Sequence, residues 1–134
     1  MEALRYILDT DIFSYVVDDR FPGLRLRFVS MAKSLSISSI TYAEARFGAV
    51  KKGSAKIDSF VGLFSDMIRI LPWEKAEADI YAFLRTDLEK RGLAIGGNDM
   101  LIAAAAMANG LTLVTNNTAH FSRIPGLKME NWVS

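Results

Sequence analysis

Short apolar runs alternate with longer amphipathic segments along all 134 residues of the chain, and no linker or repeat interrupts the alternation. The apolar runs predict five strands, at residues 6–8, 35–38, 67–71, 112–115 and 127–132. Helical patterns separate most of these runs. A strand–helix–strand order of this kind is typical of a parallel sheet covered by helices on both faces. We therefore expect one three-layer α/β domain with a central parallel sheet over residues 1–134.

Capping and stop signals mark the expected helices. Thr41, followed three residues later by Glu44, has the spacing of a capping box and predicts a helix from Thr41 to about residue 52. Asp11 stands where the helix after the first strand is expected to begin. Three more helices are predicted, at residues 55–64, 74–91 and 98–109.

Composition excludes several classes of protein. The 16 Lys and Arg residues against 15 Asp and Glu leave a net charge of +1, too balanced for a protein that coats polyanions. Cysteine is absent and His120 is the single histidine, which excludes thiolate zinc sites and histidine-cluster metal sites. The longest apolar run, residues 100–108, is far shorter than the roughly 20 residues of a membrane span. We expect a soluble cytoplasmic protein without membrane contact.

Carboxylates and amides follow the predicted strands. Ligands of parallel α/β proteins bind beyond the carboxyl ends of the strands, and the polar residues expected at that edge are Asp9, Asp11, Glu44, Asn116 and Asn117. Asp99 joins them if the chain before its helix crosses back to the same edge. Clustered carboxylates repel one another unless a cation lies between them, and oxygen ligands alone select Mg²⁺ or Mn²⁺.

Each carboxylate also has an ordinary structural interpretation. Asp9 suits a turn, Asp11 a helix N-cap, Glu44 a capping box, and Asp99 the positive end of a helix dipole. Their convergence on one edge favours a site over four unrelated caps.

Four segments carry a family resemblance: residues 7–12 (ILDTDI), 37–44 (ISSITYAE), 96–104 (GGNDMLIAA) and 113–117 (LVTNN). In this order they closely resemble PIN-domain proteins. The ending, residues 121–127 and 130–132, is similar to that of VapC toxins from type II toxin–antitoxin pairs. The resemblance covers residues 4 to 132 and implies a single PIN-like domain.

The resemblance implies a metal-dependent ribonuclease that uses Mg²⁺ or Mn²⁺. Asp9, Glu44 and Asp99 match the three central acidic positions of the family. We expect Asp9 and Asp99 to bind the metal directly, and Glu44 to bind it through water or to orient the attacking water. A bound Mg²⁺ lowers the pKa of that water and acts as a Lewis acid.

Other matched positions are polar but less specific. Asp11 stands where many relatives carry Asn, and Thr115 matches a small hydroxyl residue beside the site. With Asn116 and Asn117, these residues are expected to position phosphate or water. The chain departs from the family at His120, where relatives often carry Asp or Glu. His120 either contacts phosphate or lies on the surface before a buried phenylalanine.

The implied partners are RNA, a second copy of the chain and an antitoxin. Arg46, Lys51 and Lys52 are candidates for contacts with the RNA backbone. Structured RNA such as transfer RNA is the substrate that the resemblance implies. VapC-like proteins form homodimers and are held inactive by a VapB-like antitoxin whose tail covers the acidic site.

Three other functions remain open from the residues. Asp9 and Asp11 also match the nucleophile and the acid of a HAD phosphatase, although that motif places Thr or Val where this chain has Phe13. A receiver domain places acids on the same edge, but needs a lysine after its last strand, where Lys128 is available. A PIN-like module with weakened catalysis that mainly binds a partner is the third alternative, supported by the departure at His120.

Overall fold

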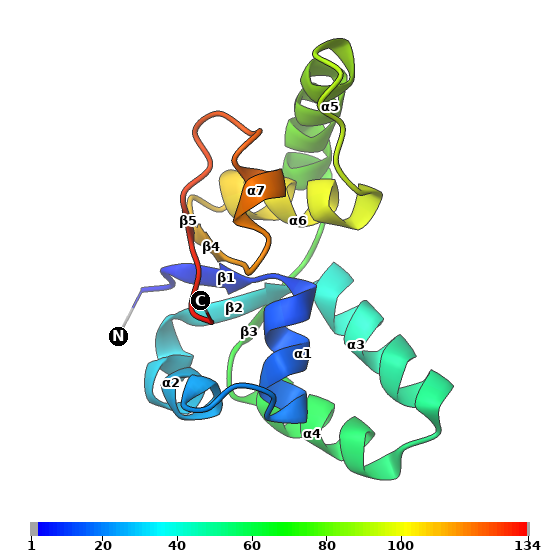
Figure 1. Ribbon diagram of the computed structural model, residues 1–134, viewed down its shortest axis with the longest axis vertical. Helices are drawn as coiled ribbons and strands as arrows, with labels where there is room; N and C mark the ends of the chain where they lie inside the picture. The colour runs from blue at the N-terminus through cyan, green and yellow to red at the C-terminus, as the bar shows by residue number, and fades with distance from the viewer. Residues whose placement is uncertain (1–2, 134) are drawn as a thin grey trace.

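Five parallel strands form the centre of the computed structural model, which describes residues 3–133 (Figure 1). Their order across the sheet is β3-β2-β1-β4-β5. The bounds are β1 (Tyr6–Leu8), β2 (Leu35–Ser38), β3 (Arg69–Leu71), β4 (Thr112–Val114) and β5 (Met129–Glu130). The predicted parallel sheet is confirmed, and β3, β4 and β5 are shorter than predicted.

Helices cover the sheet on both sides (Figure 1). On one side lie α1 (Thr10–Asp18), α2 (Leu24–Met31), α3 (Ser39–Lys52) and α4 (Ala55–Asp66), with the short 3-10 helix η1 (Ala32–Ser34) before β2. On the other side lie α5 (Lys75–Lys90), α6 (Gly97–Ala108) and α7 (Thr118–Phe121). The predicted three-layer α/β architecture is therefore confirmed.

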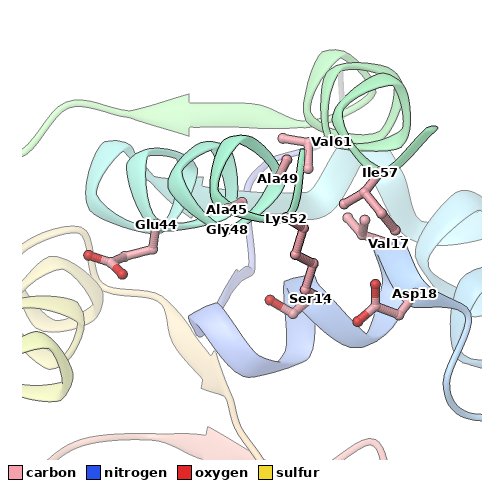
Figure 2. A pocket seen from close by; sticks show the side chains of 10 residues that line it. All are labelled: Ser14, Val17, Asp18, Glu44, Ala45, Gly48, Ala49, Lys52, Ile57 and Val61. Atoms are coloured by element: carbon pink, nitrogen blue, oxygen red, sulfur yellow. The ribbon is translucent and has the colours of Figure 1, made fainter. Parts of the chain in front are cut away.

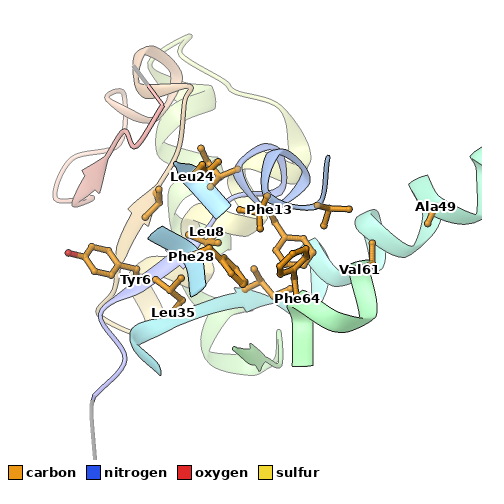
Figure 3. Close-up of a cluster of buried hydrophobic side chains, with 14 residues drawn as sticks. Tyr6, Leu8, Phe13, Leu24, Phe28, Leu35, Ala49, Val61 and Phe64 are labelled. Carbon is orange, nitrogen blue, oxygen red and sulfur yellow. The ribbon is translucent and has the colours of Figure 1, made fainter. Parts of the chain in front are cut away.

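A separate apolar cluster fills each side of the sheet. One cluster contains Phe13 of α1, Phe28 of α2 and Phe64 of α4 (Figure 3). The rings of Phe28 and Phe64 pack edge to face, with 5.6 Å between their centroids. On the opposite side, Leu88 of α5 and Phe121 of α7 enclose the alanine-rich α6. The buried alanines of α6 carry only a methyl group, so the helix can lie close to the sheet. This close packing positions the first turn of α6.

The predicted start of α3 is wrong. Ser38, the last residue of β2, is the N-cap: its Oγ accepts the backbone N–H of Ile40 at 3.1 Å. The helix therefore begins at Ser39, and the Thr41–Glu44 capping box does not form. Thr41 is instead fully buried, and its hydroxyl lies 3.1 Å from that of Thr10 in α1.

Two helices were not predicted from the sequence. α2 buries only Leu24 and Phe28 on one narrow stripe, and α7 has four residues. No helix within residues 3–133 is both long and apolar enough to cross a bilayer.

Candidate active site

Asp9 occupies the carboxyl end of β1 and caps α1. Its Oδ1 accepts the backbone N–H of Ile12 at 2.8 Å, and its own N–H donates to the carbonyl of Val114 at 3.0 Å. The side chain of Asp9 is 5% exposed. Helix α1 and the neighbouring strand β4 therefore hold this carboxylate at the centre of the edge predicted from the sequence.

Burial raises the pKa of the Asp9 carboxyl to about 6. Hydrogen bonds from the Thr115 hydroxyl and the Ile12 N–H act in the opposite direction, and the negative charges of Asp11 and Asp99 raise the pKa further. Asp9, Asp11 and Asp99 thus act on one another electrostatically across the end of the sheet. A cation placed among them would offset both the burial and the mutual repulsion.

Asp99 lies in the first turn of α6, and its helix does begin at the same edge as α1. Burial raises the pKa of Asp99, the nearby His120 ring lowers it, and Asp11 raises it. The His120 Nδ1 lies 3.9 Å from Oδ2 of Asp99. An arginine ties the loop before α6 to the α7 region, since Arg123 donates to the carbonyl of Ala94 at 3.2 Å.

The segment after β4 connects Asp9 to His120. The Thr115 Oγ1 accepts the N–H of Asn117 at 2.9 Å, and the Asn117 side-chain nitrogen lies 2.8 Å from the His120 Nδ1. Asn116 turns the other way, and its Oδ1 accepts a hydrogen bond from Asn131 at 3.2 Å. Thr115 therefore contacts the Asp9 carboxylate and Asn117 contacts His120, whereas Asn116 contacts Asn131 of the C-terminal segment.

Glu44 lines a groove whose other lining residues do not include Asp9, Asp11 or Asp99. It extends from α3 at one end of this groove between α1, α3 and α4, and Lys52 lies toward the other end (Figure 2). Gly48 and Ala45 line the groove between them and keep it open because their side chains are small. Within residues 3–133, no three Asp, Glu or His side chains lie close enough together to form a ready metal centre.

The predicted RNA-binding residues point in different directions. Arg46 pairs with Asp58 of α4 at 3.3 Å, so it faces α4. The Lys51 ammonium lies 5.8 Å from the centre of the Phe47 ring on the outer face of α3. Lys52 lines the groove that Glu44 also lines. Of the three predicted residues, Lys52 is therefore the one that shares a surface with a predicted site residue.

The donor set of this edge suits a hard cation. Asp9, Asp11, Asp99 and Thr115 offer oxygen atoms alone, and a buried carboxylate with a raised pKa gains most from a nearby positive charge. The carboxylates lie beyond the carboxyl ends of a parallel α/β sheet, which is where proteins of this class bind their ligands.

The comparisons with known proteins identify the family. The chain belongs to the PIN domain family, whose model matches residues 6–127. It is 39% identical over 132 residues to Ribonuclease VapC2 of Rickettsia felis, covering 95% of this chain and 97% of that protein. It is 34% identical over 134 residues to the tRNA(fMet)-specific endonuclease VapC of Shigella flexneri, covering 96% and 98%.

The fold agrees with a solved structure of the same kind. The crystal structure of VapBC2 from Rickettsia felis, bound to a DNA fragment from their promoter, matches with a TM-score of 0.86 and 38% identity. The match covers 96% of this chain and 99% of that one. The phosphatase interpretation depended on Asp9 and Asp11, and both residues lie within the segment that matches the PIN domain. The receiver interpretation depended on Lys128, which lies outside that segment. Both interpretations therefore give way to the PIN domain.

Proposed function

We propose that this chain is a metal-dependent endoribonuclease of the VapC type that hydrolyses RNA phosphodiesters with Mg²⁺ or Mn²⁺. One observation carries the proposal: Asp9 is buried at the strand ends, close enough to Asp11 and Asp99 for their negative charges to act on it. Burial and these charges raise the pKa of Asp9 to about 6. Relatives that cover nearly the whole chain are named ribonucleases, which supports the same reaction.

Asp9 and Asp99 are the proposed direct metal ligands. The Ile12 N–H and the Thr115 hydroxyl hold the Asp9 carboxylate in a fixed orientation. When bound, the cation supplies a water of lowered pKa and polarises the phosphate. Glu44 of α3 orients the attacking water or binds the metal through a water molecule. Asp11 adds negative charge that favours the cation.

Transfer RNA is the proposed class of substrate, as the name of the Shigella relative suggests. The test is incubation of the purified protein with total RNA and with unfractionated transfer RNA, each with Mg²⁺ and with EDTA. We expect cleavage in Mg²⁺ alone, and loss of cleavage in Asp99→Asn. Asp79→Asn is the matched control, because Asp79 is an exposed acid paired with Lys75 on α5.

A wild-type preparation that shows no metal-dependent cleavage would contradict this proposal. If such a protein still bound its antitoxin tightly, the PIN-like module with weakened catalysis would be the better interpretation.

A VapB-like antitoxin is the proposed protein partner, and the solved relative is itself a complex of toxin and antitoxin. The groove between α1, α3 and α4 is lined by small and apolar residues together with Asp18, Glu44 and Lys52, and we propose it as a contact surface for the antitoxin tail. A second copy of the chain is also proposed, because Phe47 and Val50 of α3 are 61% and 68% exposed. Light scattering of the isolated chain and of the complex measures both assemblies.

A further inference from the structure

His120 lies beside the Asp99 carboxylate on α7, a helix of four residues. Its neighbour Phe121 is fully buried in the cluster around α6, and this anchor turns His120 toward the edge of the sheet. The His120 side chain is 46% exposed, and its Nδ1 lies 3.9 Å from the Asp99 carboxylate. The imidazole is therefore both fixed at the site and accessible to a substrate.

Asn117 determines which nitrogen of the neutral His120 ring carries the hydrogen. The side-chain nitrogen of Asn117 carries only hydrogens, so in the neutral ring it donates and the His120 Nδ1 accepts at 2.8 Å, whereas the Asp99 Oδ2, at 3.9 Å, is beyond hydrogen-bond distance of the same nitrogen. In the neutral ring the hydrogen then resides on Nε2, which points away from Asn117. The Asn117 backbone is itself held by the hydroxyl of Thr115 at 2.9 Å. Thr115 and Asn117 thus fix the position of the His120 ring and leave its Nε2–H as a hydrogen-bond donor.

An RNA phosphate needs such a donor here. The phosphodiester is anionic, and Asp9, Asp11 and Asp99 repel it in the absence of a cation. The arginines nearest in the chain are engaged elsewhere. Arg123 donates to the carbonyl of Ala94, and Arg91 donates to Asp87 and to the carbonyl of Arg123.

We propose that His120 is a substrate-binding residue whose Nε2–H donates a hydrogen bond to a phosphate oxygen of the bound RNA, with Asn117 as its positioning residue. This inference rests on the proposed nuclease function. It differs from a role as a fourth metal ligand, because a metal needs a free lone pair on the ring. The Nδ1 lone pair accepts from Asn117, and Nε2 carries the hydrogen.

The experiment separates RNA binding from metal binding. Steady-state cleavage of unfractionated transfer RNA in Mg²⁺ gives KM and kcat, and calorimetry without RNA gives the Kd for Mn²⁺. His120→Ala is expected to raise KM about tenfold, as for a lost hydrogen bond to a charged group. We expect kcat and the Mn²⁺ Kd to stay within about twofold, the pattern of a lost uniform binding contact.

Two further variants test the geometry. In His120→Gln the amide nitrogen takes the place of Nε2, so KM is expected to stay within about threefold of wild type. Asn117→Ala is expected to raise KM, and to add nothing when combined with His120→Ala, because the two residues act as one unit. The Asn117 side chain does not cap α7, so this change leaves the helix start intact. Ser122→Ala, on the same turn, is the control with unchanged KM.

The outcomes are distinguishable. An unchanged KM in His120→Ala, with a wild type that cleaves RNA, overturns this inference and leaves the nuclease function standing. A Mn²⁺ Kd raised about tenfold in His120→Ala would make the ring a metal ligand and overturn the phosphate contact. A wild type without metal-dependent cleavage overturns both proposals.

Discussion

At the scale of single residues, Asp9 caps a helix and also carries a carboxylate whose negative charge is disfavoured by burial. Its Oδ1 accepts the Ile12 N–H, which an uncharged Asn would also satisfy. Its negative charge, by contrast, is buried and lies close to Asp11 and Asp99. The capping role therefore explains why a polar residue stands here, but it does not explain why that residue is ionisable.

The first prediction separates these two roles with Asp9→Asn. The pKa of Asp9 is about 6 in the folded protein against an ordinary 3.8, so between these pH values the metal-free folded state holds a proton that the unfolded chain has lost. The contribution of Asp9 to stability therefore falls as pH rises through this window, by about 3 kcal/mol in total. Asp9→Asn is expected to match wild type near pH 4, to exceed it at pH 7.5 in EDTA, and to lose RNA cleavage.

Urea unfolding at the two pH values measures this difference. An equal offset between the two proteins at both pH values would mean that the Asp9 charge is not destabilising. Asp58→Asn is a useful control, because Asp58 pairs with Arg46 away from the strand ends.

The second prediction concerns the metal itself. A proton and a cation compete for Asp9, whose pKa in the metal-free protein is about 6. Mn²⁺ affinity is therefore expected to be nearly constant above pH 7 and to fall roughly tenfold per pH unit well below 6. Calorimetric titrations between pH 5 and 8 measure this profile. An affinity that did not change across that range would place the metal away from Asp9.

At the scale of elements, the caps decide where site residues fall. Ser38 lies at the junction of β2 and α3, and its hydroxyl satisfies the N–H of Ile40. The third prediction is that Ser38→Ala costs about 1 kcal/mol of stability, because the half-buried Ile40 N–H at the helix start loses its acceptor. Thr41→Val is the matched comparison, since it removes a hydroxyl that bonds to Thr10 but caps nothing. Chemical unfolding in which Ser38→Ala kept the stability of wild type would contradict the cap at Ser38.

Sequence reasoning succeeded for elements whose apolar pattern is long or strongly periodic. The strand ends that carry Asp9 and Thr115 were predicted, and so was α6 with Asp99. The start of α3 was misplaced because Ser38, Ser39 and Thr41 are all acceptable caps, and only the length of β2 selects among them.

The contacts between distant segments were beyond the sequence pattern. Asn117, His120 and Asp99 meet because α6 packs closely on the sheet and Phe121 anchors α7. The signal available in the sequence was the buried-type phenylalanine directly after His120, which predicted the anchor but not the direction of the imidazole. Asp11 was assigned a minor part, yet its charge acts on both Asp9 and Asp99.

At the scale of the whole molecule, the site joins the two helical layers. Asp9 leads into α1, which packs in the cluster of Phe13 and Phe28, whereas Asp99 begins α6 in the cluster on the opposite side of the sheet. A cation held by both carboxylates would connect the two layers at the strand ends. Without a cation, the negative charges of Asp9, Asp11 and Asp99 repel one another at the strand ends.

The last prediction tests this connection with Asp99→Asn. Because burial and Asp11 both disfavour the charge of Asp99, the variant is expected to have a higher Tm than wild type in EDTA. Metal reverses the order. At about 100 times its Kd, an ion that binds only the folded state adds roughly 2.7 kcal/mol of stability. For a chain of this length that is on the order of 10 °C in Tm, which wild type gains and Asp99→Asn largely loses.

Melting curves of both proteins in EDTA and in Mn²⁺ measure the four values. Equal shifts with Mn²⁺ would make Asp99 a helix-dipole residue with no part in metal binding, and a lower Tm of the variant in EDTA would agree with that, because a lost favourable dipole contact destabilises the protein whether or not metal is present.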